Sequence, residues 1–189
     1  MKQVLVPIAD GSEEMEAVIT IDVLRRAGAR VHVASCMPQK SVCASRDVGL
    51  NADSLIDEIN EPHWDLIALP GGMPGASHLS EHAKLMGLIK AQISAERWLA
   101  AICAAPAVVL GRHHLIKNFR ATCYPSFQAE LETQCKQVLN EKVVTDRFLI
   151  TSQGPGTAIP FALSLVKVLY GERKAEDVAK AMVWSLCKA

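Results

Sequence analysis

Short apolar runs alternate with amphipathic segments along the first part of the chain. Residues 2–8 (KQVLVPI) and 29–36 (ARVHVASC) are apolar runs typical of strands, and residues 12–28 between them have the spacing of a helix that ends at Gly28. The order strand, helix, strand is a βαβ unit. It predicts a parallel sheet with helices packed on its faces.

The same alternation continues towards the C-terminus. Residues 65–72 and 98–103 predict strands, and residues 81–96 predict a helix between them. Residues 41–56 contain two short β-like pieces and predict a small excursion from the main sheet. Residues 148–171 predict a strand, a Gly-Pro-Gly turn and a helix that ends at Gly171, and residues 175–187 predict a last helix.

Nothing in the composition divides the chain. Its 189 residues suffice for one well-packed core, and 50% hydrophobic residues with only 5% aromatics indicate a core of Ala, Val, Ile and Leu. Without repeats or linker-like tracts, we expect a single domain over residues 1–189. Ligands of open α/β sheets bind at the carboxyl ends of the strands, so a site is expected at the loops after residues 8, 70, 103 and 152.

Charge and cysteine usage narrow the function classes. Lys and Arg number 20, as do Asp and Glu, so no net field favours nucleic acid or an anionic membrane. With no signal-peptide pattern and no apolar run near ~20 residues, we expect a cytoplasmic protein. The six cysteines form no CxxC pair, and His78 and His82 lack an apparent third ligand, so no metal is expected.

Cys103 stands where a predicted strand meets the small-residue segment AAPAVVLG. A thiolate there would feel the positive end of a helix dipole and the free N–H groups of the first turn, which lower a thiol pKa. Ala104 and Ala105 add no bulk and Pro106 suits a first turn, as in a strand-to-helix elbow that carries a nucleophile. The alternative is an ordinary buried cysteine.

Glu16 is the candidate acid. Residues 10–12 stand where a helix N-cap belongs, and Glu13 and Glu14 suit the first turn. Glu16 shares a helix face with a mostly apolar stripe and should point inward, where burial raises a carboxyl pKa and makes proton transfer near neutrality possible. This stripe consists of Ile19, Thr20, Val23 and Ala27. The alternative is a glutamate satisfied by the backbone or by Arg26.

Two glycine-containing turns complete the candidate site. The consecutive glycines of LPGG (69–72) permit a close backbone approach, so the N–H groups of Gly72 and Ala104 could hold an oxyanion formed on the sulfur. The same pair is also common in ordinary turns, and no G-x-G-x-x-G phosphate cradle is present. SQGPGT (152–157) is either a rigid turn or a pocket wall, and Arg46 either a surface ion pair or an anion-binding cap.

The segments GSEEMEA, LPGG, AAICAAPAVVL and TSQGPGTA, in this order and spacing, resemble the ThiJ/PfpI superfamily, specifically its DJ-1 branch of parkinsonism-associated redox proteins and bacterial relatives. The likeness covers nearly the whole chain. It implies a flavodoxin-like three-layer α/β sandwich, a homodimer, a reactive cysteine at Cys103, a protonated glutamate at Glu16 and an oxyanion hole at Gly72 and Ala104. Members are described as cofactor-independent glyoxalases, as deglycases and as oxidation-sensing chaperones.

Two positions depart from the family pattern. Protease-like members have a histidine directly after the cysteine, where this chain has Ala104, so a peptidase is not expected. Some DJ-1 relatives place a histidine in a THP segment, where this chain has TCYPS with Tyr124. Proton transfer must then depend on Glu16, water or the substrate. We predict that Tyr124 lines the pocket together with Arg46, Gly154 and Pro155.

Two functions follow from these residues. In the first, the Cys103 thiolate attacks an α-oxoaldehyde or its protein or nucleotide adduct, Glu16 moves the proton, and no cofactor is needed. In the second, the protein is an oxidative-stress sensor or redox-regulated chaperone, and peroxide converts Cys103 to a sulfinate that Glu16 stabilises. Neither function requires stable nucleic-acid or membrane binding.

Overall fold

The computed structural model describes residues 1–60 and 63–185. In this part of the chain, a seven-stranded sheet has the order β10-β11-β7-β6-β1-β2-β5. Neighbouring strands are parallel except for the antiparallel β10–β11 pair at one edge. The strands are β1 (Gln3–Ile8), β2 (Arg30–Ser35), β5 (Ser54–Leu55), β6 (Leu66–Leu69), β7 (Trp98–Ile102), β10 (Val143–Asp146) and β11 (Leu149–Ser152).

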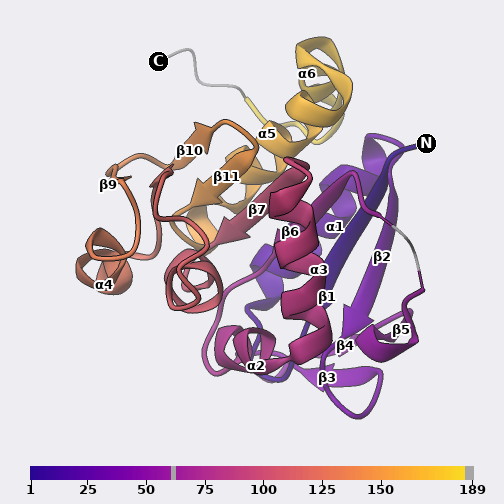
Figure 1. Ribbon diagram of the computed structural model, residues 1–189. Coiled ribbons are helices and arrows are strands. Elements are labelled where there is room, and N and C mark those ends of the chain that lie inside the picture. Colours follow the sequence, from indigo (N-terminus) through magenta and orange to yellow (C-terminus); the bar gives the residue numbers. More distant parts are fainter. Residues whose placement is uncertain (61–62, 186–189) are drawn as a thin grey trace.

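Helices cover both faces of this sheet (Figure 1). Helices α1 (Glu14–Arg26) and α5 (Ala158–Tyr170) pack together on one face, and α6 (Glu172–Ala181) packs on α5. Helices α2 (Gly75–Glu81) and α3 (Ala83–Ser94) cover the other face with the π-helix η2 (Pro106–Gly111). The predicted flavodoxin-like three-layer sandwich with a mostly parallel sheet is therefore confirmed.

Smaller elements surround the layers. The excursion predicted over 41–56 is the antiparallel pair β3 (Ser41–Cys43) and β4 (Gly49–Asn51). A second small sheet pairs β8 (Arg120–Ala121) with β9 (Gln137–Val138). The remaining helical segments are α4 (Gln128–Glu132) and the 3₁₀ turns η1 (Ile56–Glu58), η3 (Pro125–Phe127) and η4 (Pro155–Thr157).

The apolar runs form the core as their pattern predicts. Residues Val4, Leu5 and Val6 of β1 are fully buried, because a parallel strand is covered by helices on both faces. Gly171 ends α5 with φ at +91°, a left-handed conformation that costs glycine no side-chain clash. In the described residues, no helix combines the length and apolar character needed to cross a bilayer.

Three predicted helices have different limits in the structure. The segment expected over 81–96 is divided between α2 and α3, because His82 takes an extended conformation between them. Helix α1 begins at Glu14 with Glu13, rather than residues 10–12, as its N-cap. The last helix is α6 and ends at Ala181, and residues 186–187 of the predicted segment lie outside the described residues.

Candidate functional site

A cavity of about 320 Å³ opens at the carboxyl edge of the sheet, where the loops after β1, β6, β7 and β11 meet. It is lined by Glu13, Ser45, Arg46, Gly72, Met73, Cys103, Ala104, Tyr124, Phe127 and Pro155. Gly154, expected as a lining residue, is not among them. It lies behind the Tyr124 ring, so close that a Cβ at position 154 would be 3.1 Å from Cδ2 of that ring.

Cys103 directly follows β7 in a left-handed backbone conformation, with φ at +64°. This conformation is uncommon for a residue with a side chain, and two backbone hydrogen bonds hold it. The Cys103 N–H donates to the Ser152 carbonyl at 3.0 Å, and the Cys103 carbonyl accepts from the Tyr124 N–H at 2.8 Å. The residue is only 8% exposed and lines the cavity, so a reagent meets the thiol there.

The two glycines after β6 allow the backbone to approach Cys103 closely. A Cβ at position 71 would lie 2.6 Å from Cys103 Cβ, so only glycine fits without a shift. Gly72 has φ at +85°, and the backbone N–H groups of Gly72 and Ala104 are near enough to the Cys103 sulfur to lower the pKa of its thiol. Two donors therefore converge on the atom where an adduct or an added oxygen would form.

Glu16 is fully buried on the inner face of α1, as the apolar stripe predicts. Its Oε2 accepts a hydrogen bond from the Gly71 N–H at 2.8 Å, whereas the buried Oε1 has no hydrogen bond of ordinary geometry with the described residues. Burial raises the pKa of Glu16 to about 8, and the charge of Glu13 adds to the rise, while the Gly71 N–H and the Cys103 thiol lower it. Glu16 is therefore mostly protonated at pH 7.

The thiol of Cys103 has the opposite shift from the one expected. Burial raises the pKa of Cys103 to about 12 and repulsion by ionised Glu16 adds to it, although the N–H groups of Gly72 and Ala104 lower it. Burial and the neighbouring acid outweigh the N–H donors, which are the only one of these influences that is visible in the sequence around Cys103. The repulsion acts only when Glu16 is ionised, so the protonation states of the two groups are coupled and their pKa values describe the pair.

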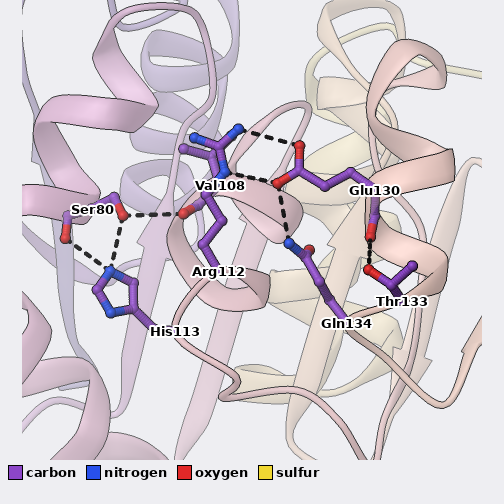
Figure 2. Close-up of polar contacts among 7 residues, drawn as sticks. All are labelled: Ser80, Val108, Arg112, His113, Glu130, Thr133 and Gln134. Atoms are coloured by element: carbon purple, nitrogen blue, oxygen red, sulfur yellow. Dashed lines mark hydrogen bonds and ion pairs between the residues drawn. The ribbon is translucent and has the colours of Figure 1, made fainter.

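The helix predicted after Cys103 is present and is a π-helix. The Arg112 N–H donates to the Ala107 carbonyl, five residues back. The Ser80 hydroxyl of α2 donates to the Val108 carbonyl at 3.1 Å, and Arg112 binds Glu130 of α4 through contacts of 2.7 and 3.2 Å (Figure 2). These contacts from two neighbouring helices hold the π-helix, which begins at Pro106, just after Cys103 and Ala104.

Two acids near the start of α1 have roles that sequence analysis missed. The Glu13 carboxylate caps the helix by accepting from the Glu16 N–H at 2.7 Å, and burial raises the pKa of Glu13. Glu14 accepts from the Ser45 hydroxyl at 2.8 Å and the Arg46 N–H at 2.9 Å, which places Arg46 at the cavity. Acidic residues are common in the first turn of a helix because they interact favourably with the helix dipole. Their presence in the sequence therefore did not indicate these contacts.

The two histidines spaced four apart have separate partners. His78 Nδ1 lies 3.0 Å from the Asp10 carbonyl, and His82 Nε2 lies 3.8 Å from the Asp57 carboxylate. No three His, Cys, Asp or Glu side chains among the described residues are grouped as metal ligands would be. The candidate site thus consists of Cys103, Glu16 and the surrounding backbone N–H groups.

Comparison with known proteins gives concordant matches. The model of the DJ-1/PfpI family matches residues 2–168. Protein DJ-1 homolog B of Arabidopsis thaliana is 46% identical over 95% of this chain and 40% of the relative, so the chain spans less than half the length of that protein. The Caenorhabditis elegans protein named glutathione-independent glyoxalase DJR-1.2 is 34% identical over 95% of this chain and 94% of its own length.

Solved structures agree with this assignment. The structure of oxidized Toxoplasma gondii DJ-1 superposes with a TM-score of 0.93 and 41% identity, covering 98% of this chain and all of the other. The likeness therefore covers nearly the whole chain.

Proposed function

Because the chain belongs to the DJ-1/PfpI family, we propose that it is a cofactor-independent enzyme that acts on α-oxoaldehydes or on their protein and nucleotide adducts. The observation that carries the proposal is the coupled pair of a buried acid and a thiol beneath two N–H donors, at the wall of a cavity. The C. elegans relative is named a glyoxalase that needs no glutathione, which agrees with a protein thiol serving as the nucleophile.

The reactive form holds one proton on the pair. With pKa values of about 8 for Glu16 and about 12 for Cys103, the pair loses its first proton near pH 8. The remaining proton can sit on Glu16, which leaves a thiolate beneath the N–H groups of Gly72 and Ala104. At pH 7 about a tenth of the molecules have lost the first proton, and the thiolate form is the minor part of that tenth because Glu16 is the stronger acid, so transfer of the thiol proton to Glu16 has to accompany the attack.

The addition step uses both the Cys103 thiolate and the protonated Glu16 carboxyl. The thiolate sulfur forms a bond to the aldehyde carbon, and the carbonyl π electrons move to oxygen, near the N–H groups of Gly72 and Ala104. Glu16 then donates its proton to that oxygen and becomes a carboxylate, which gives a neutral hemithioacetal.

The Glu16 carboxylate next moves a proton between carbons. It removes the C–H proton of the former aldehyde carbon and, through an enediol, returns it to the adjacent ketone carbon, so one carbon is oxidised and the other reduced. The product is a thioester on Cys103. Water hydrolyses this thioester to a 2-hydroxy acid and frees the thiol, so no external oxidant or cofactor is consumed.

Steady-state turnover of methylglyoxal by purified protein tests this function. We expect lactate formation without added thiols, a loss of more than about a thousandfold in Cys103→Ala and of about a hundredfold or more in Glu16→Gln. Cys36→Ala, which changes another buried cysteine, is the matched control and should stay within about twofold. If Cys103→Ala retains activity after subtraction of buffer-catalysed loss, the proposal is wrong.

A redox sensor or chaperone is the second candidate, favoured by the unpartnered Oε1 of Glu16 beside a thiol. The thiolate would attack a peroxide oxygen and release water after protonation, and a second peroxide would give the sulfinate, to which protonated Glu16 could donate. Mild peroxide should add about 32 Da at Cys103 and change the holdase activity of the protein. Oxidation spread evenly over all cysteines would count against this role.

We further propose that the protein is a homodimer that contacts its partner through α1. Met15 and Val18 lie one helical turn apart on this helix and are 50% and 46% exposed. Val18→Asp should shift sedimentation from dimer to monomer, whereas Val183→Asp, at an exposed position outside α1, should not. A monomeric native protein would contradict this proposal.

A further inference from the structure

The cavity beside Cys103 has a polar set and an apolar set of lining residues. The polar set is Glu13, Ser45 and Arg46, from the loop after β1 and the β3–β4 connection. The apolar set is Met73, Tyr124, Phe127 and Pro155, from the loop after β6 and the turns η3 and η4. A substituent on the substrate could contact either set, and the hydrogen bonds of the lining residues differ between them.

The polar residues already have partners within the protein. Glu13 accepts from the Glu16 N–H at 2.7 Å, the Ser45 hydroxyl donates to Glu14 at 2.8 Å, and Arg46 Nη1 donates to the Ser45 carbonyl at 3.0 Å. A hydroxylated ligand would have to compete with these contacts at Glu13 and Ser45, and at the other N–H groups of the exposed Arg46 it would exchange one water hydrogen bond for another, so its net gain is small.

The apolar residues, by contrast, present uncovered surface. Met73 is 45% exposed and Tyr124 is 43% exposed. Both line the cavity, and Phe127 adds a half-buried ring. An apolar group placed there removes this surface from water, which is favourable in proportion to the area covered.

Tyr124 is fixed relative to the sulfur. Its backbone N–H donates to the Cys103 carbonyl at 2.8 Å, and its own carbonyl accepts from the Phe127 N–H at 2.9 Å. Gly154 lies behind the ring, where a Cβ would be 3.1 Å from Cδ2 and 3.6 Å from Cε2. The ring is thus held at the cavity by its backbone on one side and by the bare glycine backbone on the other.

We propose that Tyr124, with Met73 and Phe127, makes the site selective for α-oxoaldehydes whose ketone carbon carries an apolar group. A group of this kind, branched aliphatic or aromatic, would pack on the Tyr124 ring while the aldehyde carbon meets the sulfur. Methylglyoxal is much smaller than the cavity of about 320 Å³ and leaves most of it to water. This inference rests on the proposed glyoxalase function and specifies its substrate class.

The test compares kcat/KM for isobutylglyoxal, phenylglyoxal, 3-deoxyglucosone and glyoxal. Isobutylglyoxal and 3-deoxyglucosone both exceed methylglyoxal in size, but only the second is polyhydroxylated. We expect isobutylglyoxal to be preferred over 3-deoxyglucosone by at least about tenfold. Because phenylglyoxal also modifies arginine, its rates are taken from initial slopes, and isobutylglyoxal decides the result.

Three variants assign the preference to the ring. Tyr124→Ala should lower the ratio of isobutylglyoxal to 3-deoxyglucosone by at least about fivefold, mainly through KM. Tyr124→Phe keeps the ring without its hydroxyl and should hold the ratio within about twofold. Gly154→Ala should lower the ratio because its methyl group pushes the ring, and no backbone strain arises since φ at this residue, 164°, is extended.

Each outcome has a distinct meaning. Equal kcat/KM for isobutylglyoxal and 3-deoxyglucosone, or a ratio that Tyr124→Ala leaves unchanged, overturns the selectivity. A loss of activity towards every substrate in Tyr124→Phe also overturns it, because the hydroxyl would then act in proton transfer. Absence of Cys103-dependent turnover of every aldehyde, glyoxal included, would instead contradict the glyoxalase function itself.

Discussion

Cys36 and Cys103 occupy similar places in the fold. Each directly follows a parallel strand of the central sheet, β2 for Cys36 and β7 for Cys103. They are 9% and 8% exposed, and they border cavities of about 330 and 320 Å³. Burial raises the pKa of both thiols to about 12. Position at a strand end and burial therefore do not distinguish the proposed nucleophile, Cys103, from Cys36.

The groups around each sulfur do distinguish them. Beside Cys36 is Asp57, whose side chain is 73% exposed and whose charge raises the pKa of the thiol further. Beside Cys103 are two N–H donors and Glu16, which is fully buried and keeps a proton to about pH 8. A buried acid can share its proton with the thiol, whereas an exposed carboxylate only repels a thiolate.

The largest effect expected from this difference concerns stability. Unfolded Glu16 loses its proton near the usual pKa of 4.5, but in the folded protein it keeps the proton to about 8, so the native state binds more protons between these values and loses stability as pH rises. Glu16→Gln does not titrate. The free energy of unfolding of Glu16→Gln minus that of the native protein should therefore increase by about 2–4 kcal/mol as the pH rises from 4.5 to 8.

Urea unfolding at several pH values measures this difference. Glu132→Gln, at an exposed position of α4, is the control and should show no growth over the same range. A constant difference between native protein and Glu16→Gln from pH 4.5 to 8 would mean that the Glu16 carboxyl is not held protonated by the fold.

A smaller effect concerns the glycine packed against Cys103. Gly71→Ala should lower the free energy of unfolding by about 1–3 kcal/mol, because the new methyl group meets Cys103 Cβ and the Ile102 carbonyl. Gly87→Ala in α3 is the matched change, with open space around its Cβ, and should raise stability by about 0.5–1 kcal/mol. Thermal unfolding of both variants separates them, and equal effects would contradict the close packing.

The smallest effect is expected at Cys36. Asp57→Asn removes a charge that raises the pKa of this thiol, so its alkylation rate at pH 8 should rise by about two- to threefold. Glu16→Gln should change the Cys103 rate in the same direction and by more, because the Glu16 carboxylate also raises the pKa of its neighbouring thiol and is buried beside it. Peptide mass spectrometry after limited iodoacetamide treatment measures both rates, and a slower Cys36 in Asp57→Asn would be inconsistent with this view.

The sequence predicts where Cys36, Cys103 and Glu16 lie in the fold. Apolar runs place strands before Cys36 and Cys103, and the three- and four-residue spacing around Glu16 predicts its inward direction. The direction of the Cys103 pKa shift was not predictable, because it depends on how deeply the sulfur is buried and on the separation of two residues far apart in sequence. The π-helix was not predictable either, because it is held by Ser80 and Glu130, which belong to other elements and are distant in sequence.

The central claim is that Glu16 and Cys103 ionise as a pair, and the pH dependence of Cys103 alkylation tests it most directly. We expect ionisation of Glu16 near pH 8 to hold back the Cys103 thiolate in native protein, so that Glu16→Gln, which carries no charge there, is alkylated at Cys103 at lower pH and faster above pH 8, while Cys36 reacts slowly in both proteins. A Cys103 profile unchanged in Glu16→Gln, or one that coincides with that of Cys36, would contradict the account.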